Sequence, residues 1–183
     1  GNTAVGWGAT IREIDHLATL FDEVTHLAPL HPDPPPKSAL PYAASNLRLA
    51  FVQPAGGERF KNKLGILRQI PTLLSAMKRE IGRADAVHIR CPAGISLVGL
   101  IAIRLWGKGK PTWVKYAGNW GSYPKQPFSY KLQQWYLVKN FHKGVGTING
   151  KWPNQPPHVI SFDNPSFTED EYRQAVQNAA KKQ

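Results

Sequence analysis

Short strand-like runs and amphipathic helix-like stretches alternate along most of this chain, and that alternation constrains the fold more than any other feature. Strands separated by helices are joined by right-handed crossovers, which favour a mostly parallel sheet. The chain has 183 residues, enough for one ordinary domain with its own core. Because no internal repeat or linker-like stretch interrupts it, we expect a single α/β domain over residues 1–183.

The expected elements follow from the spacing of apolar residues and from the positions of Gly and Pro. Helices are predicted over 10–21, 64–81, 94–106, 128–139 and 168–180. Strands are predicted over 23–30, 47–53, 84–89, 111–117, 144–148 and 157–162. Thr10 and Thr168 each stand three residues before a Glu, which is the spacing of a capping box. Pro71 is expected to kink its helix or restart it.

The charge is strongly positive and unevenly spread. The net charge is +11, from 23 Lys and Arg against 12 Asp and Glu. Residues 86–162 contain no acidic residue, ten Lys or Arg, and five of the six Trp. A field of one sign attracts phosphates, nucleic acid or an acidic membrane surface. The alternative is a basic surface that only keeps the protein in solution.

Several classes of site are not expected. The single cysteine, Cys91, excludes an internal disulfide framework and a multi-cysteine zinc site, and it fits a reducing, cytoplasmic compartment. We predict that Cys91 is a buried filler and not a nucleophile, because nothing in the sequence supplies it with a base. The six His show no metal-ligand spacing, and His88 is expected to be a satisfied core residue. No metal and no cofactor are therefore predicted.

We expect no membrane-spanning helix, and no signal peptide in the first residues of the given sequence. The longest apolar run, 93–103, is well short of the ~20 residues that cross a bilayer. The first residues lack the basic and apolar blocks of a signal peptide. Walker, HExxH and GxSxG motifs are absent too. Asp163 is the one carboxylate expected near the loops, so no catalytic residue is assigned and a self-contained hydrolase is not expected.

In parallel sheets, ligands bind beyond the carboxyl ends of the strands, so the loops there are the candidate sites. Gly6, Gly8 and Thr10 belong to a glycine-bearing loop that enters a helix, where free amides suit a phosphate; a plain helix cap is the alternative. Arg90 ends a strand and is expected to hold a carboxylate or phosphate, unless it forms a salt bridge with a neighbouring loop.

The most suggestive loop follows the strand predicted over 111–117. Tyr116, Gly118, Asn119 and Trp120 combine rings, an amide and close backbone approach, which a sugar site requires. The alternative is a core Trp beside a Gly-rich turn. Asn149 repeats the arrangement after the next strand, or belongs to an ordinary Asn-Gly turn.

Four strings, FDEVTHLAP, ADAVHIRCP, WVKYAGNW and HVISFDNPSFTEDE, together with the element order, give the chain a family resemblance. From Gly6 to Tyr172 it resembles the N-terminal, acceptor-side domain of GT-B retaining glycosyltransferases of family 4. The resemblance implies a Rossmann-like three-layer αβα sandwich with a mostly parallel sheet. Residues 1–5 are too short for the family's first central strand, so that strand is expected to be missing.

The resemblance also implies a function, the binding of the acceptor in sugar transfer from a nucleotide sugar. A glycan or lipid-linked sugar is the implied acceptor of this hexosyltransferase class, contacted by Trp7, Arg90, Tyr116, Asn119 and neighbours. Many family members carry a His where this chain has the Gly118–Trp120 loop. For these residues the resemblance therefore implies contact with the acceptor but no catalytic role. The nucleotide-sugar-binding domain is expected to be absent, so the chain should be inactive alone or work with such a domain in trans.

The partners follow from charge and resemblance together. We expect a cytoplasmic protein peripheral to the inner face of the membrane, with residues 94–110 as the contact with anionic lipid. A homodimer would allow a partner strand to replace the missing one. The alternative functions are a nucleic-acid-binding module and a stand-alone dimeric interaction domain.

Overall fold

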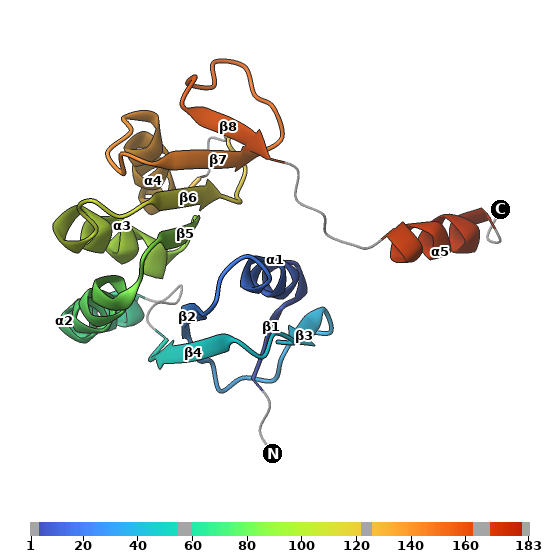
Figure 1. Ribbon diagram of the computed structural model, residues 1–183, viewed down its shortest axis with the longest axis horizontal. Coiled ribbons are helices and arrows are strands. Elements are labelled where there is room, and N and C mark those ends of the chain that lie inside the picture. Colours follow the sequence, from blue (N-terminus) through green and yellow to red (C-terminus); the bar gives the residue numbers. More distant parts are fainter. Residues whose placement is uncertain (1–3, 55–59, 122–125, 163–168, 181–183) are drawn as a thin grey trace. The chain divides into compact units, whose positions relative to one another are not determined.

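The computed structural model describes residues 4–54, 60–121, 126–162 and 169–180 (Figure 1). It is an α/β structure in which the chain divides into two compact units. The first unit comprises residues 1–26, 32–49 and 164–183, and the second comprises residues 27–31 and 50–163. The α/β class and the mostly parallel pairing that the sequence predicts are confirmed.

A four-stranded parallel sheet forms the centre of the second unit. Its strands are β5 (Val87–Cys91), β6 (Thr112–Tyr116), β7 (Val145–Asn149) and β8 (Val159–Phe162), in the spatial order β5-β6-β7-β8. Helix α3 (Gly94–Trp106) joins β5 to β6, and α4 (Phe128–Val138) joins β6 to β7. All four strands therefore end at one edge of the sheet, which is where the predicted site loops emerge.

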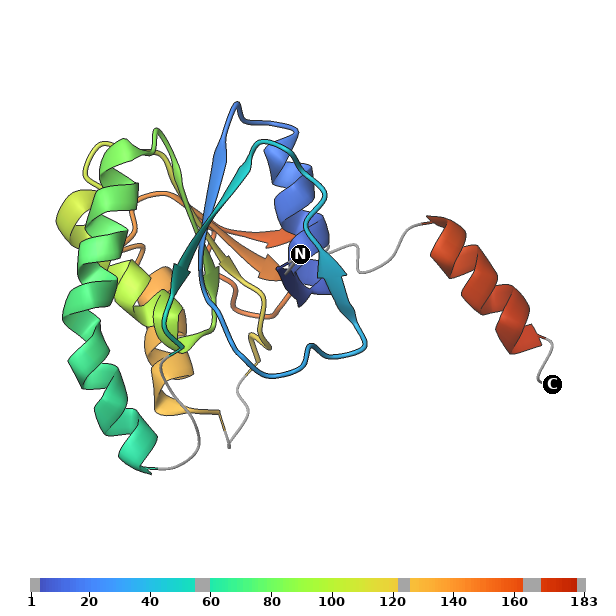
Figure 2. The same ribbon diagram turned by 90° about the horizontal axis from the view of Figure 1, so that it is seen from below.

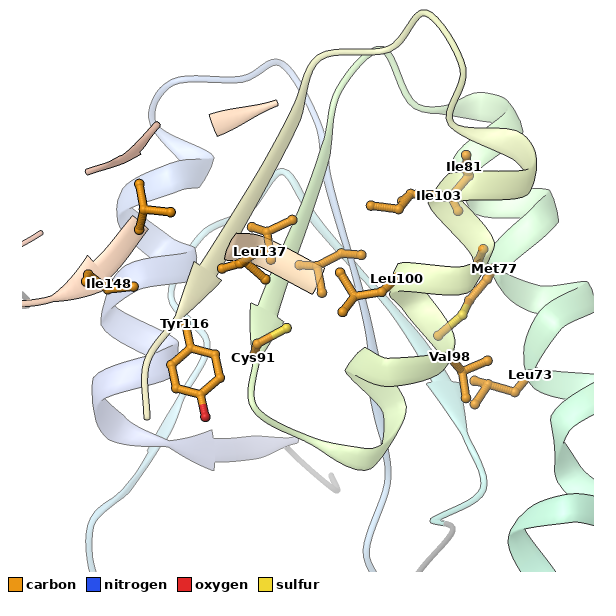
Figure 3. Packing of buried hydrophobic residues seen from close by; sticks show 14 residues of the cluster. Leu73, Met77, Ile81, Cys91, Val98, Leu100, Ile103, Tyr116, Leu137 and Ile148 are labelled. Atoms are coloured by element: carbon orange, nitrogen blue, oxygen red, sulfur yellow. The ribbon is translucent and has the colours of Figure 1, made fainter. Parts of the chain in front are cut away.

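The helices of this unit pack on one side of that sheet. Figures 1 and 2 show α2 (Phe60–Arg83), α3 and α4 together there. Alternate strand residues meet them in one apolar core, because successive side chains of a strand point to opposite faces (Figure 3). The core draws on three helices and all four strands, including Leu73, Met77, Leu100, Val114, Tyr116, Leu137, Ile148 and Val159.

Two details of the second unit differ from the sequence-based expectation. Helix α2 continues past Pro71, so the predicted restart is wrong; Pro71 lies within the helix at an exposed position. Strand β5 starts at Val87, three residues later than expected, because residues 85 and 86 form a bend after α2. Helix α3 has the predicted bounds.

The first unit holds short strands and helix α1 (Gly8–Ala18). A three-residue strand, β1 (Val5–Trp7), pairs antiparallel with β3 (Ala39–Pro41), an element the sequence did not predict. Because β1 and β3 form a separate two-stranded sheet, β1 is not the central parallel strand that was expected to be missing. The helix begins at Gly8, so the capping box proposed at Thr10 is wrong. Trp7 takes the N-cap position without a side-chain hydrogen bond.

The remaining elements follow the predicted pattern. β2 (Val24–Pro29) and β4 (Leu47–Val52) form a two-stranded sheet. α5 (Glu169–Ala180) has no buried residue, and Glu171 in it accepts two hydrogen bonds from the Arg12 guanidinium of α1, at 2.6 and 2.7 Å. The second predicted capping box begins at Thr168, outside the described residues.

Candidate functional site

The loops after β5, β6 and β7 meet at the carboxyl edge of the parallel sheet. The β6 loop is anchored to β5, because the Ala117 amide donates to the Cys91 carbonyl at 2.6 Å. Gly118 then lies against the Pro92 ring. A Cβ at position 118 would stand 2.8 Å from Pro92 Cδ, so only glycine fits without displacing the loop.

The β6 and β7 loops are tied to each other by side chains. Asn149 Nδ2 donates to the Ala117 carbonyl at 3.2 Å, and Trp152 Nε1 donates to the Asn149 carbonyl at 2.8 Å. The Trp152 ring also covers Gly121, where a Cβ would stand 2.8 Å from Trp152 Cζ3. These contacts fix an amide and an indole beside the β6 loop.

Two rings of the β6 strand and loop form an edge-to-face pair. The centroids of Tyr116 and Trp120 are 5.4 Å apart with an interplanar angle of 83°. Tyr116 is fully buried, and its hydroxyl accepts a hydrogen bond from Gln126 Nε2 at 3.0 Å. Burial raises the pKa of Tyr116 to about 12, so this phenol is a neutral hydrogen-bonding group and not a base at neutral pH.

Trp120 and Trp152 are both half-buried and pack against the core. Both residues are therefore partly exposed, so the core-Trp alternative describes only part of their environment. We call Tyr116, Asn119, Trp120, Asn149 and Trp152 the amide–aromatic cluster. The cluster combines rigid rings with two side-chain amides on neighbouring loops.

The two amides differ in their hydrogen bonding. Asn119 is exposed, and its Oδ1 accepts from the Gly121 amide at 3.1 Å, which shapes the loop. Asn149 Oδ1 is buried and has no hydrogen-bond partner among the described residues. A buried amide oxygen without a hydrogen-bond partner is costly.

Glutamines on α4 hold the loop of the cluster and the loop after β5, and sequence reasoning missed them. Gln134 Nε2 donates to the carbonyls of Asn119 and Trp120, both at 3.2 Å. Gln133 is fully buried; its amide exchanges two hydrogen bonds with the Ala93 backbone, at 3.1 and 3.3 Å. In the sequence they look like ordinary polar helix residues. Trp152, also left out of the predicted set, had a signal, since it stands three residues after the end of β7.

Arg90 and Lys115 are neighbours in register on β5 and β6. Lys115 is fully buried, with its Nζ 4.0 Å from the centroid of the Phe162 ring, which is a cation–π geometry. The Arg90 carbonyl accepts a hydrogen bond from the Ser96 hydroxyl. An anion contact by the Arg90 guanidinium stays a prediction.

The predicted glycine-bearing loop lies in the first unit, whereas the amide–aromatic cluster belongs to the second. The Gly8 amide donates to the Ser38 carbonyl at 3.1 Å, so one of the amides expected to face a phosphate is already bonded. Gly6 and Gly8 allow close packing: a Cβ would stand 2.7 Å from Ile11 Cδ1 and 2.6 Å from Ser38 O, respectively. Trp7 is 65% exposed, and Thr10 lies inside α1. Ligand contact by these residues stays a prediction.

The remaining titratable groups offer no nucleophile or metal centre within the described ranges. Cys91 is 1% exposed, and burial raises its pKa to about 12, which confirms the filler interpretation. His88 is half-buried, with Nδ1 3.2 Å from the Trp113 carbonyl and its ring 4.0 Å from the Trp113 ring. The described residues contain no group of His, Cys, Asp or Glu that could hold a metal. Asp163 lies outside them.

Comparison with models of known protein families, with curated proteins and with solved structures finds no match for this chain. In the described part of the chain, no helix is both long and apolar enough to cross a membrane.

Proposed function

We propose that this chain binds the sugar acceptor of a retaining glycosyltransferase of the hexosyltransferase class. The observation that carries the proposal is the amide–aromatic cluster at the carboxyl edge of a parallel sheet. A pyranose has an apolar C–H face and a rim of hydroxyls. Indole rings pack against such a face, while amide groups donate to and accept from hydroxyls.

The chemistry of the edge favours binding over catalysis by this chain. In the described loops at this edge there is no carboxylate, and the buried phenol of Tyr116 is no base. Asn119 and Asn149 are neutral at every physiological pH. The acceptor is therefore a glycan or the sugar of a lipid-linked acceptor, recognised through neutral hydrogen bonds. No transfer step is assigned to a residue of this chain.

The finer fold belongs to the same proposal. A Rossmann-like three-layer αβα sandwich would place helices on both faces of the parallel sheet. Two observations support this fold. Helices α2, α3 and α4 cover one face of the sheet, and strands alternate with helices along the second unit. The acceptor site at the carboxyl ends of the strands follows the general rule for such sheets.

A location in the cytoplasm, peripheral to the inner face of the membrane, completes the proposal. A lipid-linked acceptor lies at a bilayer surface, and the acid-free stretch 86–162 is basic. A nucleotide-sugar domain in trans is the partner that would supply the donor.

The test is calorimetric titration of the purified chain with the methyl glycosides of glucose, mannose, galactose and N-acetylglucosamine. In parallel, the chain is titrated with UDP-, GDP- and ADP-sugars. The proposal expects heat with one glycoside and none with the nucleotide sugars. Tight binding of a nucleotide sugar, with no glycoside bound, would assign the site to the donor and contradict the proposal.

Asn119→Ala tests the site within the same titration. Loss of one neutral hydrogen bond of about 1 kcal/mol should weaken glycoside binding about five-fold. Asn178→Ala, on the exposed helix α5, is the matched control and should leave binding unchanged. Oligonucleotide binding with a steep salt dependence, and no response to glycosides, would favour the nucleic-acid alternative.

A further inference from the structure

Helix α4 presents an aromatic face to solvent. Phe128 is 80% exposed and Trp135 is 48% exposed, and Val138 is exposed beside them. Gln133 and Leu137 are the buried residues of α4 and lie on the opposite side of the helix. Because a helix turns 100° per residue, positions 128 and 135 stand two turns apart on one stripe. Large rings on a solvent-facing stripe are unusual in a helix whose inner face is already packed.

Helix α3 has an outer apolar stripe of the same kind. Leu105 is 58% exposed, and Ile101 one turn before it is exposed as well. The two helices touch, because the Tyr136 hydroxyl of α4 donates to the Leu100 carbonyl of α3 at 3.1 Å. Both pack on the same side of the sheet (Figure 2). Their outer stripes therefore belong to one face of the second unit, which we call the α3–α4 surface.

Cations accompany the apolar side chains on this surface. Lys131 and Lys139 are exposed on and just after α4, and Arg104 and Lys108 are exposed on and just after α3. Neither helix contains an acidic residue. The surface thus combines exposed rings and aliphatic side chains with charge of a single sign.

We propose that the α3–α4 surface docks on an anionic phospholipid bilayer. Aromatic side chains favour the interface between headgroups and acyl chains, and each nearby cation is attracted to anionic headgroups. Exposed rings also occur at the centre of protein–protein interfaces, and light scattering in the test below reports whether a second copy of this chain occupies the surface instead. Nucleic acid would need the rings beside a groove that tracks its backbone, and the rings here lie on the crest of a helix.

The surface extends the segment expected from the sequence. Within 94–110, Trp106 is half-buried, with Lys78 Nζ 5.8 Å from the centroid of its ring. The most exposed rings, Phe128 and Trp135, come from α4, outside that segment. This inference names the residues that would hold the protein at the membrane surface proposed above. It does not depend on sugar binding at the amide–aromatic cluster.

The test is co-sedimentation of the full chain with vesicles of equal parts phosphatidylcholine and phosphatidylglycerol, and with vesicles of phosphatidylcholine alone. We expect binding to the mixed vesicles and little to the neutral ones. Lys131→Gln with Lys139→Gln should weaken binding about 25-fold, since each cation near the surface contributes about five-fold. Lys37→Gln with Lys151→Gln, exposed lysines outside the surface, is the matched control.

The apolar half of the surface is tested by Phe128→Ser, a change at an exposed ring that leaves the core intact. It should weaken binding to the mixed vesicles at least ten-fold, about the value of one buried aromatic side chain. Leu20→Ser, at an exposed leucine in the first unit, should not. Far-UV circular dichroism checks that both variants fold, and calorimetry with the glycosides reports the sugar site separately.

Three results would overturn the inference. The first is vesicle binding that both α4 variants leave unchanged. The second is a wild-type dimer in light scattering that Phe128→Ser converts to a monomer, which would make the surface an interface between copies. The third is oligonucleotide binding that depends on Lys131 and Lys139 while vesicles are not bound.

Discussion

His142 shows how burial sets the chemistry of a single side chain in this molecule. It is buried in the segment between α4 and β7. Burial lowers the pKa of its ring chiefly through desolvation, and the charge of His158 lowers it further. The folded state therefore favours the neutral form of the His142 ring. Cys91 and Tyr116 respond to burial in the opposite direction, because their neutral forms are the protonated ones.

The shift at His142 predicts an acid-sensitive stability. The folded state binds this proton more weakly than the unfolded state, whose histidine has its ordinary pKa of 6.5. The stabilisation from a neutral His142 is therefore complete above that ordinary pKa and is lost as pH falls from there to the lowered folded pKa. Urea unfolding at about pH 8 and about pH 5 should show lower stability in acid.

His142→Gln isolates that contribution. The variant should be less stable than the parent near neutral pH and should lose less stability on acidification, while His31→Gln, at an exposed position, should follow the parent. An unchanged pH dependence in His142→Gln would show that other groups cause the acid sensitivity.

At the scale of the elements, close backbone approach decides which glycines are essential. The start of β7 passes the start of β6 so closely that a Cβ on Gly144 would stand 2.0 Å from the Thr112 carbonyl oxygen. That atom is backbone and cannot move aside as a flexible side chain could. Gly82, near the end of α2, has open space where its Cβ would stand.

The two glycines should respond in opposite directions to the same substitution. Gly144→Ala is expected to destabilise the protein by about 3 kcal/mol or more, because the two strands must separate. Gly82→Ala should stabilise it by up to about 1 kcal/mol through helix propensity. Chemical denaturation of both variants checks the pair, and equal effects would contradict the packing described for β6 and β7.

The contact between α4 and the loop after β5 depends on Gln133. Gln133→Met keeps the volume but removes the bonds to the Ala93 backbone and the bond to the Ser129 carbonyl. We expect a loss of about 2–3 kcal/mol, since buried backbone groups are left unsatisfied. Gln134→Met, at a half-buried position, should cost less. A neutral effect of Gln133→Met would mean that the loop finds other partners.

The elements also show what the sequence could and could not predict. Regular apolar spacing predicts α3 and the four strands of the parallel sheet, because each buries one face in a single core. β1 and β3 have three residues each, too few for a pattern. The start of α1 is fixed by a bond from Gly8 to Ser38, thirty positions along the chain, which local capping rules do not contain.

The position of the candidate site was predictable from the sequence, but the contacts that hold its loops were not. The strand ends at Tyr116 and Asn149 locate the loops, and parallel strands bring those loops to one edge. The glutamines on and before α4 were not predictable, because they act by reaching across to backbone carbonyls of another loop. Only the fold makes that contact visible.

At the scale of the whole molecule, two surfaces of the second unit have separate assignments. We propose that the amide–aromatic cluster at the carboxyl edge binds a sugar and that the α3–α4 surface binds a bilayer. A protein with both would take its acceptor from the surface on which it docks. Each assignment can fail without the other, because the residues that test them do not overlap.

Sugar binding at the amide–aromatic cluster is the central claim, and the indole N–H signals of the six tryptophans test it most directly. They are observed by nitrogen–proton NMR during titration with the four methyl glycosides, and Trp120→Phe and Trp152→Phe assign the two site signals. We predict that one glycoside shifts the signals of Trp120 and Trp152 and leaves that of Trp135, on α4, in place. If no glycoside moves these two signals, or if only signals elsewhere move, the claim is contradicted.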